Sequence, residues 1–276
     1  MSGGGKEAEL FLVWNGSLQS AKEISINPTS EGWLYGVGCF ETMGLKGGVI
    51  RFFENHWHRL NSTASAMGLQ IPFSPEQIED KVSEMAGKNE CPNGIARLSL
   101  HLNGENVDWM LRVFLGKRAS RGSLQVGLSE MVHPGASLLS RWKNNNYLLH
   151  HLAFRQAQEA GWDEALMCRG DEVVEGTRSN VWILREAELL TPPLTSGALP
   201  GVIRHRLLAL KSIGDLTVRE ERLRLEDLEE ADGLFFSNAG MILRSATKLG
   251  AWEFPAHEDR VRSLATAIGA DSLNSG

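Results

Sequence analysis

The chain has 276 residues, of which 42% are hydrophobic and 22% are charged. This composition is typical of a globular protein and excludes a disordered or fibrous one. Its 34 aspartates and glutamates outnumber its 28 lysines and arginines, for a formal charge of −6, so we expect binding neither to nucleic acid nor to an anionic membrane. The length predicts two domains.

Cys39, Cys91 and Cys168 are widely separated and lack the spacing of a metal site. Their odd number argues against a disulfide framework and predicts a reducing, cytoplasmic compartment. The apolar run at residues 10–14 is far shorter than the roughly 18 residues of a membrane helix. We therefore expect neither a signal peptide nor a membrane anchor.

Residues 10–116 are predicted to form an α+β unit that mixes short strands with two helical stretches. Trp57, Leu60 and Ala64 recur at helical spacing, while two later runs alternate or are continuously apolar, as in paired strands. Turn-forming pairs separate these runs at residues 15–16, 47–48 and 103–104. The predicted elements include a helix over residues 54–67 and strands over 95–102 and 110–115.

A polar, basic connector at residues 117–121 predicts a domain boundary, which divides the chain into residues 1–118 and 119–276. The second domain is predicted to contain strands over residues 124–128, 164–168, 181–184, 217–222 and 233–237. Its predicted helices cover residues 147–160, the segment from Pro200-Gly201 to 210, and 225–230. Residues after about 270 are predicted to form a frayed tail.

Three short segments have residue types that suit chemistry. Lys143 lies between Trp142 and three asparagines, where a desolvated lysine becomes a nucleophilic amine, although a solvated loop lysine has the same pattern. Glu175 follows two β-branched residues and precedes a small polar turn, which is equally typical of an ordinary strand end. Residues 199–204 combine a turn with a helix start, which suits a phosphate but more often merely starts a helix.

The sequence contains no Walker loop, Gly-x-Gly-x-x-Gly, His-Glu-x-x-His or Gly-x-Ser-x-Gly motif, so the common nucleotide, zinc and serine-hydrolase assignments lack support. Across about residues 10–250 it resembles the fold-type IV family of pyridoxal-phosphate enzymes, which contains branched-chain and D-amino-acid aminotransferases and 4-amino-4-deoxychorismate lyase. The matching motifs occur in family order at residues 35–42, 56–60, around Lys143, and at 163–166, 175–180, 191–193, 197–204 and 237–239.

The resemblance implies pyridoxal 5'-phosphate as the cofactor and gives two residues its central chemistry. Lys143 matches the lysine that bonds covalently to the cofactor aldehyde and then moves the substrate's proton. Glu175 matches the carboxylate that pairs with the pyridine nitrogen and keeps it protonated, which makes the ring a better acceptor of electrons.

Further residues are expected to bind the cofactor by the same resemblance. Arg59 and the backbone N–H groups of Val202 and Ile203 match the phosphate site, although relatives usually have threonine at the position of Ile203. Tyr147 matches a tyrosine that hydrogen-bonds the cofactor's phenolic oxygen. The remaining cofactor-binding candidates are Asn180 and Asn238.

On the substrate side, the resemblance selects Tyr35, Arg97 and Arg178. Arg97 lies in a strand that in relatives supplies a cation for the substrate carboxylate, and an outward-facing strand arginine is the equal alternative. Arg178 reaches a second carboxylate or simply points to solvent. We expect no metal, because helix packing and surface exposure explain the histidines that suggest one, which are His56, His58, His150 and His151.

The family fold is α+β with two domains: a small α/β N-terminal domain, and a larger domain with a β-barrel-like core and helices. The resemblance also implies that the cofactor lies between the domains and that the protein is a homodimer. Its partners are then a second copy of the chain and a small-molecule amino acid or aminodeoxychorismate substrate.

Two enzyme activities compete within the family, and a non-catalytic binding relative is a third possibility. The four-residue step from Lys143 to Tyr147, residues 163–166 and residues 237–239 resemble lyases that form 4-aminobenzoate and pyruvate. Val37, where many lyases carry aspartate, and Ile203 depart from that pattern, which leaves open an aminotransferase for branched-chain L-amino acids or D-amino acids. The joint presence of Lys143 and Glu175 argues against the non-catalytic alternative.

Overall fold

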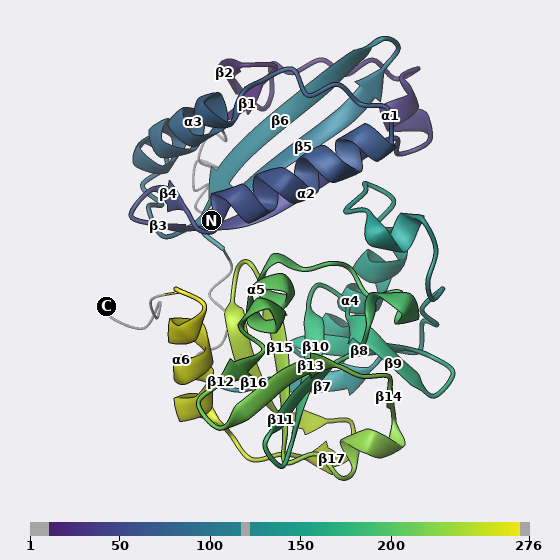
Figure 1. Ribbon diagram of the computed structural model, residues 1–276. Helices are drawn as coiled ribbons and strands as arrows, with labels where there is room; N and C mark the ends of the chain where they lie inside the picture. Colours follow the sequence, from purple (N-terminus) through teal and green to yellow (C-terminus); the bar gives the residue numbers. More distant parts are fainter. Residues whose placement is uncertain (1–10, 117–121, 271–276) are drawn as a thin grey trace, which may run out of the picture. The chain divides into compact units, whose positions relative to one another are not determined.

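The computed structural model describes residues 11–116 and 122–270. It divides into two compact units, residues 1–116 and 117–276 (Figure 1). Their content of 28% helix and 35% strand confirms the predicted α+β fold class. The predicted boundary between residues 118 and 119, the basic connector at 117–121 and the tail after residue 270 lie outside the described residues.

The first unit is built on a six-stranded sheet with the strand order β2-β1-β6-β5-β3-β4, in which every pairing is antiparallel. Its strands are β1 (Phe11–Trp14), β2 (Ser17–Ser20), β3 (Gly38–Lys46), β4 (Val49–Ile50), β5 (Ile95–Asn103) and β6 (Asn106–Phe114). Its helices are α1 (Glu31–Leu34), α2 (Phe53–Ala66) and α3 (Pro75–Lys88).

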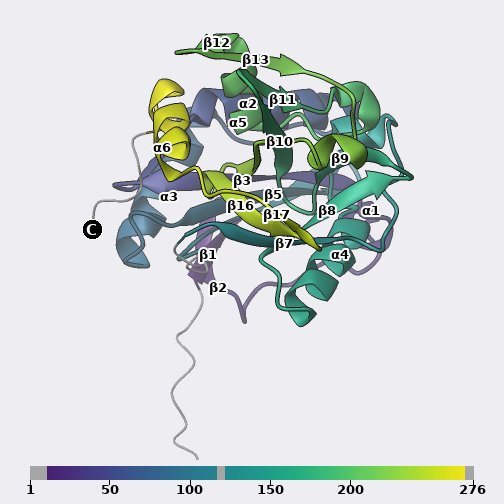
Figure 2. The same cartoon turned by 90° about the horizontal axis from the view of Figure 1, so that it is seen from below.

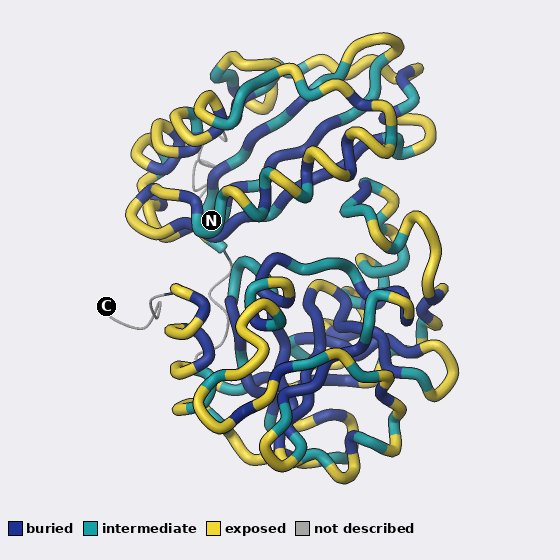
Figure 3. Tube along the Cα trace, in the orientation of Figure 1, coloured by how far each residue is buried: buried dark blue, intermediate teal, exposed yellow. Residues whose placement is uncertain are grey.

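Helices α2 and α3 pack against one face of this sheet and enclose the core of the first unit. Figure 3 shows the strands as buried and the outward faces of both helices as exposed. α3 begins with a capping box, in which the Ser74 hydroxyl accepts from the Gln77 amide and the Gln77 side chain accepts from the Ser74 amide. The core includes Leu60 and Ala64 from α2, Ile78, Val82 and Met85 from α3, and Leu98 and Leu111 from the sheet.

The second unit is built on a mixed sheet with the strand order β12-β13-β11-β10-β15-β16-β7-β8-β9-β14, with β17 beside β16. Its strands are β7 (Leu124–Leu128), β8 (Glu164–Arg169), β9 (Glu172–Gly176), β10 (Asn180–Arg185), β11 (Glu188–Thr191), β12 (Ser212–Ile213), β13 (Leu216–Glu220), β14 (Leu223–Arg224), β15 (Gly233–Asn238), β16 (Ile242–Leu249) and β17 (Trp252–Glu253). Its helices are α4 (Leu148–Glu159), α5 (Val202–Leu210) and α6 (Glu258–Ala267), with 3₁₀ turns η1 (Leu139–Arg141), η2 (Leu194–Ser196) and η3 (Glu226–Leu228).

The sheet of the second unit curls around its own core (Figure 2). From β10 it runs through β15, β16, β7 and β8 to β9, and β9 contacts β10 again. Buried side chains from these strands meet in the enclosed space, including Val126, Leu166, Val173, Ile183, Leu234 and Ala246. The result is the β-barrel-like core that the family resemblance implies.

Most predicted elements differ from the observed ones only at their ends, but two differ more. The strand predicted at 110–115 is β6, which is nine residues long and begins earlier, at Asn106. Asp108 holds this polar start of the strand, because its carboxylate accepts from the side-chain amides of Asn15 and Asn103. The helix predicted at 225–230 is only the 3₁₀ turn η3. Within the described residues, no helix is both long and apolar enough to cross a membrane.

Candidate functional site

Lys143 lies in a loop between η1 and α4 whose shape is fixed by its neighbour Asn144. The Asn144 side chain is buried, donates to the carbonyls of Leu139 and Trp142 at 3.0 and 3.1 Å, and accepts from the Asn146 amide at 2.9 Å. The asparagine-rich segment thus satisfies its own backbone and holds Lys143 half-buried.

Tyr147 and His150 extend from Lys143 as a stack of rings. The Lys143 Nζ lies 5.6 Å from the centroid of the Tyr147 ring. Tyr147 immediately precedes α4, and His150 follows three residues later on the same side of the helix, so their rings stack at 4.7 Å with an interplanar angle of 18°. The Tyr147 hydroxyl donates to the Thr177 carbonyl at 3.1 Å.

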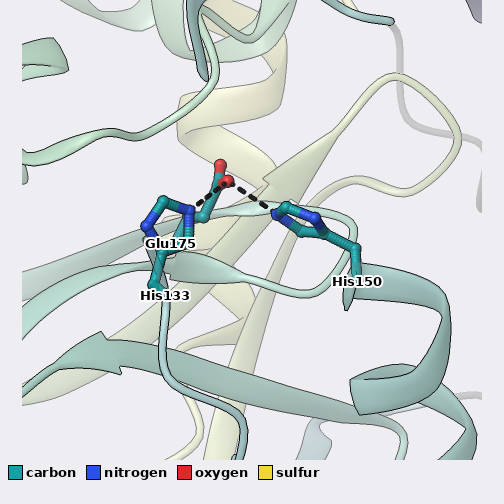
Figure 4. A group of neighbouring side chains, drawn as sticks. All are labelled: His133, His150 and Glu175. Carbon is teal, nitrogen blue, oxygen red and sulfur yellow. Dashed lines mark hydrogen bonds and ion pairs between the residues drawn. The ribbon is translucent and has the colours of Figure 1, made fainter. Parts of the chain in front are cut away.

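Glu175, near the end of β9, is a buried carboxylate that contacts three donors, of which Figure 4 shows His133 and His150. Its Oε1 lies 3.4 Å from His133 Nε2 and 3.2 Å from His150 Nε2, and its Oε2 accepts from the Leu199 amide at 2.9 Å. Burial by itself raises the pKa of Glu175, but hydrogen bonds and charge interactions with His133 and His150 outweigh burial and lower the pKa to about 2. Glu175 is therefore ionised at neutral pH.

The turn after Glu175 is held by a second buried carboxylate, Glu164. Its Oε1 accepts from the Thr177 amide at 3.0 Å and from the Thr177 hydroxyl, and its Oε2 accepts from the Ser179 hydroxyl at 2.8 Å. Asn238 supports the same turn, since its side-chain amide donates to the Arg178 carbonyl at 3.1 Å. The position of Glu175 thus depends on β8 and β15 as well as on β9.

The start of α5 provides backbone donors of the kind that bind anions. No side chain caps this helix, whose preceding residue is Gly201, and the first N–H groups of a helix have no acceptor within it. The side chains of Val202 and Ile203 are buried. Asn180 fixes the approach to the helix, because its amide donates to the Leu199 carbonyl at 2.9 Å and its Oδ1 lies where a Cβ at Gly201 would clash, at 2.0 Å.

In the first unit, Arg59 belongs to a cluster around Glu41 of β3, which is buried to 1% exposure. Arg59 donates to both carboxylate oxygens at 2.7 Å, and His56 Nδ1 lies 2.7 Å from Oε2. His56 and Arg59 are three residues apart in α2, so both face the sheet. Burial alone raises the pKa of Glu41, whereas the charges and hydrogen bonds of Arg59 and His56 lower it to about 2.

The three residues selected for the substrate do not form one cluster within either unit. In the first unit, Arg97 packs its guanidinium 3.9 Å from the centroid of the Phe40 ring, and Tyr35 is exposed. In the second unit, Arg178 stacks 3.2 Å from the centroid of the Phe154 ring. Arg178 is exposed, and its guanidinium covers an aromatic ring of α4.

His150 differs from its expected role, because packing and exposure do not account for its contact with Glu175. Sequence reasoning also missed His133 and Glu164. His133 is a single histidine in a loop after β7, with no repeated spacing that could relate it to Glu175. Glu164 lies in residues 163–166, one of the motifs shared with the family, yet only the buried turn reveals what its carboxylate binds. Of the other histidines considered, His58 and His151 are exposed and His56 contacts Glu41.

Comparison with known proteins identifies the class to which this fold and these residues belong. The profile of the amino-transferase class IV family matches residues 38–249, and the chain belongs to this family. Its cofactor is pyridoxal phosphate, and it is a pyridoxal-phosphate-dependent enzyme of the aminotransferase or lyase type.

Similar sequences include aminotransferases from bacteria and archaea. The chain is 24% identical over 250 residues to a D-alanine aminotransferase of Bacillus licheniformis, covering 82% of this chain and 84% of that protein. It is 30% identical over 242 residues to a proposed branched-chain-amino-acid aminotransferase of Methanocaldococcus jannaschii, covering 82% and 83%.

Solved structures share the fold over nearly the full length. The branched-chain amino acid aminotransferase of Escherichia coli superposes with a TM-score of 0.83 at 20% identity, covering 97% of this chain and 98% of that one. A Legionella pneumophila protein, whose proposed assignment is 4-amino-4-deoxychorismate lyase, superposes with a TM-score of 0.81 at 24% identity, covering 90% and 96%.

The residues of the second unit have the chemistry that pyridoxal phosphate requires. An ionised carboxylate has about four acceptor directions, and the donors on Glu175 take three of them, which leaves one for a protonated pyridine nitrogen. The uncapped start of α5 suits the phosphate, and Lys143 supplies an amine. The donor set therefore fits the cofactor.

Glu41→Gln is expected to destabilise the protein at neutral pH and to lose this effect in acid. A carboxylate whose pKa is lowered on folding stabilises the protein fully above its unfolded pKa of about 4.3. That stability is lost as the pH falls through the folded pKa of about 2. We expect a destabilisation on the order of 3 kcal/mol at pH 7, measured by urea unfolding of the full chain between about pH 2.5 and pH 7.

Glu79→Gln is the matched control, because Glu79 is an exposed glutamate of α3. It should change the free energy of unfolding by less than about 0.5 kcal/mol at every pH. If Glu41→Gln lowers stability equally across the whole pH range, the ionised cluster is not the source of the effect.

Proposed function

We propose that this enzyme is a 4-amino-4-deoxychorismate lyase that forms 4-aminobenzoate and pyruvate. One observation supports this proposal above the others: the three segments in which the chain resembles lyases all bind the turn that follows Glu175. Tyr147 donates to Thr177, Glu164 accepts from Thr177 and Ser179, and Asn238 donates to Arg178. The features that suggest the lyase are thus joined in one arrangement around the proposed pyridine partner.

In this proposal Lys143 is the catalytic amine. It holds the cofactor's aldehyde carbon covalently, and after the substrate displaces it, it removes the proton from the amine-bearing carbon. The bond between the ring carbon and the enol ether oxygen then breaks, so that enolpyruvate leaves as the ring becomes aromatic. The proton that Lys143 removed goes to the methylene carbon of enolpyruvate, which gives pyruvate. The half-buried loop supported by Asn144 keeps the lysine's position defined, which is what proton transfer requires.

The cofactor, when bound, supplies an electron sink for the negative charge that develops at that carbon. Glu175 pairs with the pyridine nitrogen and keeps the proton there, which its pKa of about 2 favours, because a carboxylate of such low basicity does not take the proton for itself. At the phenolic oxygen Tyr147 would donate its hydroxyl in place of the bond that it makes to the Thr177 carbonyl. Glu175 and Tyr147 are thus assigned to two different atoms of the cofactor ring, and His150 contacts both of these residues.

The phosphate is bound, we infer, by the backbone N–H groups of Val202 and Ile203 and by Arg59. The backbone amides suffice where relatives have a threonine hydroxyl in place of Ile203. Asn180 acts on this site by fixing the Leu199 carbonyl. Arg59 also donates to both carboxylate oxygens of Glu41.

The substrate's two carboxylates are assigned to arginines. Arg97 is the first candidate and Arg178 the second, and both have their guanidinium groups held against aromatic rings. Tyr35 is proposed as a further substrate contact. We also propose that the enzyme is a cytoplasmic homodimer, as the family resemblance implies.

An aminotransferase is the second candidate, and the relatives favour it. The D-alanine aminotransferase and the proposed branched-chain aminotransferase match over 82% of the chain, and Val37 and Ile203 depart from the lyase pattern. In this alternative Lys143 returns the proton to the cofactor's C4′ carbon instead. The same residues serve both reactions, so the substrate that the enzyme turns over distinguishes the two activities.

Lys143 should be the single site of covalent attachment. Borohydride reduction of the enzyme reconstituted with pyridoxal phosphate should add one phosphopyridoxyl group to the peptide that contains Lys143, as measured by mass spectrometry. Lys143→Ala should abolish both labelling and turnover, whereas Lys248→Ala, which removes an exposed lysine of the same unit, should retain both. Labelling at any other lysine would contradict the assignment.

The lyase and the aminotransferase differ in what they leave behind. A lyase returns the cofactor as the aldehyde, while an aminotransferase without a keto acid converts it to pyridoxamine phosphate. We expect 4-amino-4-deoxychorismate to yield 4-aminobenzoate and pyruvate with the yellow absorption band restored. Branched-chain L-amino acids and D-alanine should bleach the band only slowly. Rapid bleaching by one of them without 4-aminobenzoate would establish the aminotransferase and make Arg97 the leading carboxylate contact.

A further inference from the structure

His133 and His150 approach the same oxygen of Glu175 from opposite parts of the second unit (Figure 4). His133 follows β7 and is fixed to β8, because its backbone N–H donates to the Cys168 carbonyl at 2.8 Å. His150 belongs to the first turn of α4. Their rings meet edge to face, with centroids 5.8 Å apart, so the two histidines also contact each other beside the carboxylate.

The proton of His133 has only one possible position. The Gly135 N–H lies 3.0 Å from His133 Nδ1, and because a backbone amide can only donate, Nδ1 must be the acceptor. The remaining ring proton is therefore on Nε2, which faces the ionised Glu175. Gly135 has a φ of 80°, and a Cβ there would lie 2.8 Å from Arg169 Cδ, so a glycine is required where this amide turns back toward the ring.

This tautomer argues against a metal at the same place. His133, His150 and Glu175 offer ligand atoms within 4.8 Å of one another, which is the geometry of a three-ligand site. Metal binding through His133 Nε2 would move its proton to Nδ1, directly against the Gly135 N–H. The two histidines are therefore better explained as hydrogen-bond donors.

His150 connects the carboxylate to the rest of the site. Its Nε2 lies 3.2 Å from Glu175, and its ring stacks on Tyr147, whose ring lies near Lys143 Nζ. A change in the orientation of Glu175 is thus transmitted to the tyrosine proposed for the other side of the cofactor ring.

We propose that His133 and His150 are positioning residues that orient the free acceptor direction of Glu175 toward the pyridine nitrogen, with His133 fixed as the Nε2–H tautomer by the Gly135 amide. The proposal rests on the role of Glu175 under the proposed function. It adds that this carboxylate is aimed by two specific donors, and that neither histidine needs to contact the cofactor.

The first test needs no cofactor. Long-range ¹H–¹⁵N spectra of the apoprotein, labelled at its histidines, should give His133 a protonated Nε2 and an unprotonated Nδ1 at neutral pH, with His133→Gln used to assign the signals. Zinc chloride should leave these signals unchanged. A protonated Nδ1, or zinc binding that His133→Leu abolishes, would overturn the proposal.

The second test measures the cofactor itself in the reconstituted enzyme. With pyridoxal phosphate labelled with ¹⁵N in its ring, His133→Leu and His150→Leu should each shift the ring-nitrogen signal toward that of the unprotonated pyridine. They should also weaken cofactor affinity about tenfold or more, the effect of losing a hydrogen bond to a charged group. His133→Gln should restore most of both, because the glutamine amide places a donor near the position of Nε2.

His151→Leu is the control, because His151 is the exposed neighbour of His150 in α4, and it should change neither quantity. If Glu175→Gln shifts the ring-nitrogen signal while both histidine variants leave it unchanged, this inference fails and the role of Glu175 stands. If Glu175→Gln also leaves the signal unchanged, the proposed role of Glu175 is wrong. The apoprotein spectrum then tests only the tautomer of His133.

Discussion

The Glu175 carboxylate carries its charge inside the protein, and this burial constrains much of the second unit. A buried charge is tolerated only when donors replace the water it has lost. Here the donors come from the loop after β7, from α4 and from the Leu199 amide ahead of α5. Removing one partner of a buried charge typically costs about 3–5 kcal/mol, so these three elements are held in mutual register by one side chain.

That register links the parts of the cofactor site. Leu199 is held through both of its backbone polar groups, by Glu175 at its N–H and by Asn180 at its carbonyl, and it lies just ahead of the uncapped start of α5. The ring-nitrogen partner and the proposed phosphate site are thus joined through a single residue. Glu41 shows the same principle in the first unit, where Arg59 and His56 balance a buried carboxylate.

Local sequence patterns predicted the elements well where periodicity and turn residues agree, as in β7, which begins and ends at the predicted residues, and α2, which is shifted by one. The family motifs selected Lys143, Tyr147 and Glu175, which the fold brings to one region. The pattern could not reveal His133 or the function of Glu164, because their partners lie in other strands and loops. The pattern also could not show whether a residue contacts the cofactor or supports the backbone around its site. Asn180 and Asn238 were expected beside the cofactor, and the bonds observed for their side chains are to backbone groups.

The pairing of Glu175, aimed by its histidines, with the pyridine nitrogen of the cofactor is the proposal on which the others depend. A crystal structure of the enzyme reconstituted with pyridoxal phosphate tests it most directly. We expect a Glu175 oxygen about 2.7–2.9 Å from the ring nitrogen, with the contacts to His133, His150 and Leu199 retained and Lys143 bonded to the aldehyde carbon. A ring nitrogen that faces another group, or a metal ion held between Glu175 and the two histidines, would contradict the account.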